Sequence, residues 1–126
     1  MGFTESVKVG LNQFFTATGR ATLSEFWWYY IFVFIITAVL AVIGGFIENY
    51  GMEQVWLGII FQCISAVLAI SLLCAEIRRL HDTGKSGWNV CWGLIPLIGW
   101  IIVIVMLCRP SQPGANQYGD SPYDKY

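Results

Sequence analysis

The clearest pattern along this chain is the alternation of long apolar runs with short polar segments. Three runs contain no Asp, Glu, Lys or Arg, and they cover residues 26–47, 54–75 and 86–108. At about 1.5 Å of rise per residue, a helix over any one of them reaches roughly 33 Å, and a hydrocarbon core is about 30 Å thick. The pattern therefore predicts three transmembrane helices at these positions.

Polar segments flank these runs and complete the predicted fold. In the leader, 1–25, apolar residues recur every three or four positions, which is typical of an amphipathic helix. We expect this helix to lie in the membrane interface or, alternatively, to pack on the ends of the spans. The tail, 109–126, is rich in Pro, Gly, Ser and Asn and is expected to be an irregular cap or a mobile end. The predicted fold class is an all-α integral membrane protein, one domain over 1–126, with three transmembrane helices, an N-terminal amphipathic interfacial helix and an irregular C-terminal tail.

The third run contains the sequence IPLIG, in which Pro96 interrupts the expected helix. Proline lacks the amide donor and clashes with the carbonyl four residues earlier, so we expect a kink. A re-entrant hairpin that turns at Pro96 to Gly99 is the competing interpretation. It would return the tail to the cytoplasm.

Composition and charge agree with a membrane protein and orient it. The chain is 56% hydrophobic and 12% charged, which is more apolar surface than a soluble domain of 126 residues can bury. Basic residues lie in the leader and in the loop 76–87, whereas the loop between the first two runs has none. Lys and Arg in short loops stay cytoplasmic, so we predict a cytoplasmic N-terminus and, after three spans, a tail on the opposite side. The net charge of −1 gives no indication of nucleic-acid binding.

The loop RRLHDTGKSGW, 78–88, carries several charged side chains but lacks the parts of a catalytic site. TGKSG resembles the end of a phosphate-binding loop, yet Arg79 occupies the position of its first glycine, and the chain has no room for a nucleotide-binding α/β domain. His81 is the only histidine, and adjacent residues such as His81 and Asp82 point in different directions on a helix. The cysteines form no CxxC pair. We therefore predict no catalytic residue, no metal site and no cofactor.

The charged residues of the cytoplasmic face support two hypotheses. In one, basic side chains beside the N-terminus of the third run bind a lipid phosphate. In the other, which we favour, they pair internally and clamp the ends of the spans. Asp82 lies four residues after Arg78, and such a spacing allows pairing on a helix. Glu76 lies three residues before Arg79. The candidate residues for either role are Arg20, Glu25, Arg78, Arg79, His81, Asp82, Lys85 and Ser86.

Four motifs occur in an order that resembles a known family. They are GRATLSEFWWY, RRLHDTGKSGW, IPLIG and GANQYGDSPY. Over nearly its whole length the chain resembles the small bacterial inner-membrane proteins grouped as domain of unknown function 805. It departs from them at Leu23, where the family usually has arginine, and at Asn89, where a second aromatic residue is common. The resemblance implies a bacterial inner-membrane protein and supplies no activity. The matching positions are Gly19, Arg20, Glu25, Phe26, Trp27, Arg78, Arg79, Leu80, His81, Asp82, Gly84, Ser86, Gly87, Trp88, Asn116, Tyr118, Gly119 and Pro122.

These observations lead to three functional hypotheses. We favour a non-enzymatic membrane component that acts through helix contacts in the lipid bilayer, as a homo-oligomer or as an accessory to a larger membrane complex. The alternatives are a small oligomeric transporter or channel component and a binder of anionic lipid headgroups. Transport usually needs polar groups at mid-depth, and only Thr37, Gln62 and Ser65 approach that position. We expect Gln62 to bond another helix or its own backbone rather than to line a pathway.

Overall fold

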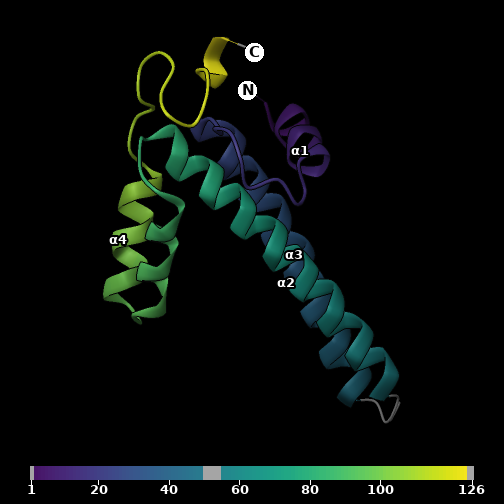
Figure 1. Cartoon of the computed structure of the whole chain (residues 1–126). Helices are drawn as coiled ribbons and strands as arrows, with labels where there is room; N and C mark the ends of the chain where they lie inside the picture. Colours follow the sequence, from purple (N-terminus) through teal and green to yellow (C-terminus); the bar gives the residue numbers. More distant parts are fainter. Residues whose placement is uncertain (1, 50–54, 125–126) are drawn as a thin grey trace.

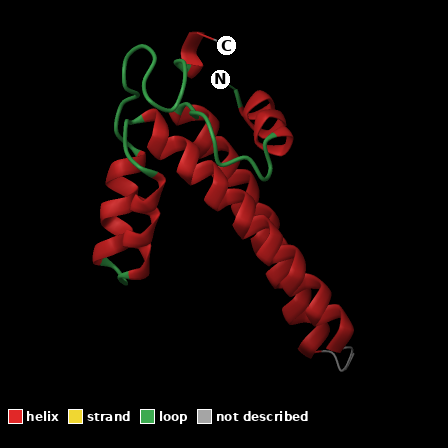
Figure 2. Cartoon of the chain, in the orientation of Figure 1, coloured by secondary structure: helices red, strands yellow, loops and turns green. Residues whose placement is uncertain are grey.

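The structure is a computed structural model that describes residues 2–49 and 55–124. These residues form helices joined by loops and contain no β-strand (Figure 2), so the all-α class is confirmed. The predicted turn between the first two runs lies mostly outside the described residues. The elements are α1 (Phe3–Asn12), α2 (Leu23–Asn49), α3 (Val55–Asp82), the 3₁₀-helix η1 (Gly87–Leu94), α4 (Ile98–Leu107) and the short 3₁₀-helix η2 (Pro122–Asp124).

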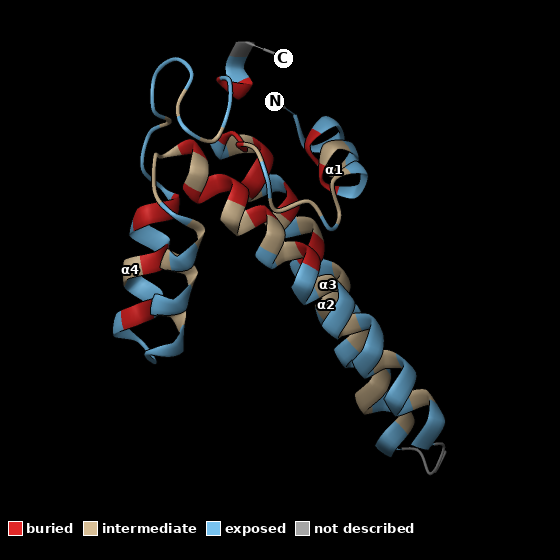
Figure 3. Ribbon diagram, in the orientation of Figure 1, coloured by how far each residue is buried: buried red, intermediate tan, exposed pale blue. Residues whose placement is uncertain are grey.

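Helices α2 and α3 lie side by side as a long antiparallel pair (Figure 1). They contain 27 and 28 residues, so each is about 40 Å long. Their most apolar windows have mean hydropathies of 2.7 and 2.4, and both helices are long and apolar enough to cross a membrane. Toward the end of α2 and the start of α3, their side chains are mostly exposed (Figure 3). Apolar side chains in that position suit lipid and not water. The two helices coincide with the first two predicted spans, 26–47 and 54–75.

The third run is not one continuous helix over 86–108, so the predicted count of three spans is not confirmed. The chain runs through η1, turns at Pro96 and Leu97, and returns as α4 (Figure 1). Leu97 has φ 62° and ψ −66°, and the Ile98 amide donates to the Pro96 carbonyl at 2.8 Å, which is a γ-turn. A proline followed by so tight a turn reverses the chain instead of kinking a helix. The competing interpretation, a hairpin turning at Pro96 to Gly99, describes this geometry.

The two arms of this hairpin approach each other closely because the sequence places glycine at the contact. A Cβ atom at Gly99 would lie 1.7 Å from the Trp92 carbonyl oxygen, so no other residue fits there without displacing the backbone. Trp100 donates its indole N–H to the carbonyl of Gly93 at 3.0 Å. That bond joins α4 to the backbone of η1. The IPLIGW sequence therefore encodes the hairpin.

Helix α1 packs on α2. This agrees with the second of the two expectations for the leader, a helix packed on the ends of the spans. Gly10 is buried against the ring of Tyr29, and a Cβ atom at Gly10 would lie 2.3 Å from that ring. Phe3 contacts the ring of Trp28 edge-on, with centroids 5.6 Å apart. The opposite surface of α1 carries exposed polar residues, so the helix is amphipathic and its apolar side has a partner within the chain.

The path of the third run determines where the tail lies. The tail lies at the same end of the molecule as the leader and the C-terminus of α3 (Figure 1). Arg20 of the leader donates to the carbonyl of Gly114 in the tail at 2.6 Å. The third run thus returns to the end from which it started, and the tail packs beside the leader.

Candidate functional site: a buried arginine cluster

Five charged residues form a buried group, called here the arginine cluster. Three of them, Arg78, Arg79 and Asp82, lie in the last turn and a half of α3. Glu25 lies in the first turn of α2, and Arg20 lies just before that helix. Each residue is at most 8% exposed, and most of the buried residues lie at this end of the structure (Figure 3). Five charges in one interior require partners, because an unpaired buried charge is costly.

Glu25 is positioned by the start of α2. The hydroxyl of Thr22 accepts a hydrogen bond from the Glu25 amide at 3.0 Å, which is an N-cap at the start of α2. The Glu25 carboxylate then accepts from Arg78 Nη1 at 2.9 Å. The same nitrogen donates to the side-chain oxygen of Gln13, just after α1, at 2.6 Å. Arg78 therefore joins the leader, α2 and α3.

Arg79 joins α3 to the hairpin. Its Nε donates to the carbonyl of Leu107, the last residue of α4, at 3.0 Å, and an Nη donates to the carbonyl of Arg109. These carbonyls have no partner within α4, and a cation at a helix C-terminus is also favoured by the helix dipole. Its other Nη pairs with the carboxylate of Asp82. The guanidinium group thus supplies donors to the carbonyls at the C-terminal end of α4 and attaches this end to α3.

Arg20 joins the leader to α3 and to the tail. Its Nε lies 2.9 Å from the Asp82 carboxylate in a buried ion pair. Its other nitrogens donate to the carbonyls of Gly114, at 2.6 Å, and Gln112, at 2.5 Å. The tail therefore folds around one guanidinium group. Asp82, which also accepts from the Ser111 hydroxyl, lies at the centre of the cluster.

The cluster contains three cations and two carboxylates, so its formal charge is +1. Further acceptors come from the leader, from the end of α4 and from the tail, and hydrogen bonds to charged groups are stronger than those between neutral groups. Among the described residues, one buried side-chain atom lacks a partner, Nε of Arg78. The pairing differs from the helix-spacing expectation, since Arg78 pairs with Glu25 and Asp82 pairs with Arg79 and Arg20.

His81 and the tail form a second contact beside the cluster. The ring of His81 stacks on the ring of Tyr118, with centroids 3.9 Å apart and planes 5° from parallel. Nδ1 of His81 lies 3.0 Å from the Gly19 carbonyl, and the Asn116 amide donates to the His81 carbonyl at 2.9 Å. Reasoning from composition alone missed these tail residues. The available signal was the GANQYGDSPY motif, whose asparagine donates to the His81 carbonyl and whose tyrosine stacks on the His81 ring.

Lys85 and Ser86 belong to the turn that follows α3. Gly84 has φ 80°, its amide donates to His81 O, and the Lys85 amide donates to Leu80 O at 2.9 Å, which is the glycine-terminated helix end known as a Schellman motif. The Ser86 hydroxyl then accepts from the Trp88 amide at the start of η1. The TGKSG sequence therefore ends one helix and begins another. Lys85 makes no ion pair with any described residue.

The polar residues of the spans are separate from the cluster. Thr37 donates its hydroxyl to the Val33 carbonyl of its own helix at 2.8 Å, and Ser65 lies with it along a groove between α2 and α3. Gln62 is exposed and is not one of the residues that line this groove. Over 2–49 and 55–124, no group of three or more His, Cys, Asp or Glu side chains could hold a metal ion.

The architecture and the cluster define a small helical membrane protein in which buried arginines join the helix ends and the tail. The chain belongs to the family described as "Protein of unknown function (DUF805)", which matches residues 14–120. It is similar to the "Inner membrane protein YhaH" of Escherichia coli, at 32% identity over 114 residues that cover 89% of this chain and 91% of the relative. It is also similar to the "Inner membrane protein YhaI" of the same organism, at 31% identity over 112 residues that cover 89% and 90%. No solved structure matches the chain.

Proposed function

We propose that this protein is a non-enzymatic component of a bacterial inner membrane that acts through helix contacts, as a homo-oligomer or as an accessory to a larger membrane complex. The observation that carries the proposal is the arginine cluster. Its guanidinium groups are buried and bonded to acceptors from the leader, α3, α4 and the tail. Such groups hold the fold together and leave little of their surface for a substrate. The names of the two relatives support the inner-membrane location.

The proposed membrane arrangement has two spanning helices and one re-entrant hairpin. Helices α2 and α3 cross the bilayer. Helix α4, with 10 residues, reaches about 15 Å and enters only part of the hydrocarbon core. Its backbone at the turn is covered by hydrogen bonds within the hairpin, as insertion requires. The residues around the turn are apolar and strongly exposed, as lipid contact would require: Leu94, Leu97 and Ile98 are 83%, 68% and 67% exposed.

In this arrangement both termini are cytoplasmic. The leader, the end of α3, the loop after it and the start of the tail share one end of the molecule, and every described Lys and Arg lies there. The last turn of α2 contains Glu48, and the segment between α2 and α3 contains Glu53 and no basic residue in the sequence. Basic segments stay in the cytoplasm, so the segment between α2 and α3 faces the periplasm.

Reporter fusions test this arrangement. We expect a green fluorescent protein fused after Tyr126 to fluoresce and an alkaline phosphatase at the same position to be inactive. Alkaline phosphatase inserted between residues 51 and 52 should be active. An active phosphatase after Tyr126 would contradict the hairpin and restore a third span. Affinity capture through the tail from native membranes then tests the role: recovery of copies or of a defined membrane complex supports it, and recovery of the monomer alone contradicts it.

A weaker second candidate is an anionic lipid headgroup at Lys85. This lysine has no ionic partner among the described residues and lies beside the N-terminus of η1, whereas Arg78 and Arg79 are buried. The expected effect of Lys85→Gln is a lower amount of co-purified anionic lipid at unchanged stability. Unchanged lipid would end this candidate.

A further inference from the structure

We infer that the face of α3 that carries Gln62 is a self-association site, at which the Gln62 amides of two copies hydrogen-bond to each other. The inference rests on the proposed membrane placement of α3. It adds to that proposal the position of the contact and the chemistry that selects the partner.

The side-chain amide of Gln62 lacks a hydrogen-bond partner among the described residues and lies in an apolar environment. It lies near the middle of the uncharged run 54–75, at a depth where the surroundings are hydrocarbon. Its side chain is exposed and makes no hydrogen bond to any described residue. Thr37 provides the contrast, because its hydroxyl is satisfied by the Val33 carbonyl of its own helix. An amide that faces lipid without a partner costs free energy, so a partner from outside the chain is favoured.

The surface around Gln62 allows a second helix to come close. Gly58 lies one turn before it and Ala66 one turn after it on the same face, and both are exposed. A Cβ atom added at Gly58 would meet nothing within 4 Å. Small residues on either side of a polar one let two backbones approach to the distance that a hydrogen bond between their side chains requires.

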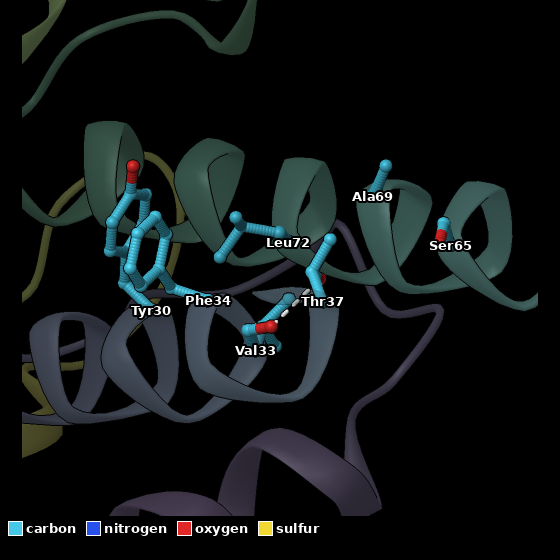
Figure 4. A pocket seen from close by; sticks show the side chains of 7 residues that line it. All are labelled: Tyr30, Val33, Phe34, Thr37, Ser65, Ala69 and Leu72. Atoms are coloured by element: carbon cyan, nitrogen blue, oxygen red, sulfur yellow. Dashed lines mark hydrogen bonds between the residues drawn. The ribbon is translucent and has the colours of Figure 1, made fainter. Parts of the chain in front are cut away.

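A groove beside this face supplies space for the partner's side chains. Ser65 and Ala69 of α3 line it, opposite Phe34 and Thr37 of α2 (Figure 4). Its volume is about 220 Å³. Most of its wall is apolar, so it suits an aliphatic side chain. The groove and the amide thus form one surface with an apolar part and a polar part.

The chemistry of the amide selects a second copy of this chain over a lipid. An acyl chain can fill the groove but can neither donate to Gln62 nor accept from it. A second Gln62 does both, because the amide contains a carbonyl acceptor and two N–H donors. Two copies related by a two-fold axis would form the same bond in each direction, which is how most homodimers are built.

Disulfide cross-linking in native membranes tests the inference with Gln62 in place. In a background where Cys63, Cys74, Cys91 and Cys108 are replaced by Ala, Ala66→Cys places a thiol on the proposed face. Ile64→Cys is the matched control, because it lies 200° around the helix from Gln62 at nearly the same depth and is also exposed. We expect mild oxidation to convert the Ala66→Cys protein to a dimer and to leave the Ile64→Cys protein monomeric. Equal cross-linking of the two, or cross-links to other proteins only, would overturn the inference.

The amide itself is tested by Gln62→Leu in the Ala66→Cys background. We expect dimerisation to weaken about 3- to 10-fold, measured as the protein-to-lipid ratio at which half of the protein is cross-linked. Thr37→Val is the control and should leave this ratio unchanged. An unchanged ratio for Gln62→Leu would contradict the role of the amide. Extraction of the same membranes with alkaline carbonate separates the two proposals: protein that stays in the membrane but does not dimerise contradicts only self-association, whereas protein that is released contradicts the membrane placement and this inference with it.

Discussion

Arg20 and Asp82 are 62 positions apart in the sequence and form a buried ion pair with 2.9 Å between Nε and Oδ1. The pair lies where the leader, the end of α3 and the tail meet. The Asp82 carboxylate also pairs with Arg79, which holds the end of α4. One carboxylate therefore pairs with two arginines. Arg20 binds the tail and Arg79 binds the end of α4, so the position of the tail depends on the position of the hairpin.

Removing one member of this pair should destabilise the protein strongly. We expect Asp82→Asn to lower the free energy of unfolding by about 3–5 kcal/mol, because it leaves the buried Arg20 and Arg79 without their carboxylate. Arg20→Gln should cost less, because Asp82 keeps its pair with Arg79. The double variant should cost less than the sum of the two, since the interaction between Arg20 and Asp82 is lost only once. Unfolding in mixed micelles measures both quantities. Asp120→Asn, which alters an exposed carboxylate in the tail, is the control, and additive effects of the two cluster variants would contradict the pairing.

The hairpin should depend on Gly99 and not on Gly93. A methyl group at Gly99 would collide with the Trp92 carbonyl oxygen, whereas nothing lies within 4 Å of a Cβ atom at Gly93. We expect Gly99→Ala to separate α4 from η1 and to lower the midpoint of thermal unfolding in detergent, and Gly93→Ala to have little effect. Equal midpoints for the two variants would mean that the two arms do not approach as described.

Helix α1 should lose its place on α2 when Gly10 is enlarged. A Cβ atom at Gly10 would lie 2.3 Å from the ring of Tyr29, so Gly10→Leu forces the helix away from α2 at a cost of about 1–3 kcal/mol. The measurement is protease cleavage after Lys8, which we expect to accelerate in membranes that expose the cytoplasmic face. Gly2→Ala, where nothing lies within 4 Å, should cleave at the wild-type rate. An unchanged rate for Gly10→Leu would show that α1 is not docked there.

The tail should be released by loss of the stacking contact between His81 and Tyr118. Tyr118→Ala removes the ring that lies 3.9 Å from His81, while the backbone bonds around Arg20 remain. We expect faster digestion of the tail by a carboxypeptidase and faster hydrogen exchange at residues 112–120. Gln117→Ala, an exposed neighbour with no side-chain contact among the described residues, is the control. If both variants were digested at the wild-type rate, the stack would have no part in holding the tail.

Prediction from sequence succeeded where one residue pattern allowed one structure. Two runs without charge could only be long apolar helices, and these are α2 and α3. The candidate residues were found from charge and position, and the structure brings five of them together: Arg20, Glu25, Arg78, Arg79 and Asp82. The exact pairs were not predictable, because helix spacing favours Arg78 with Asp82 while the tertiary structure offers Glu25 instead.

The sequence by itself determined the helical class, the first two apolar helices and the amphipathic leader, since these depend on the local order of apolar and polar residues. Only the tertiary structure decided the path of the third run. A run of 23 residues, 86–108, is long enough for either a span or a hairpin. The hairpin depends on the close approach of Gly99 to Trp92 and on Arg79, which donates hydrogen bonds to the carbonyls at the end of α4. The position of the tail follows from that choice, because the carbonyls that surround Arg20 come from segments more than 60 residues away along the chain.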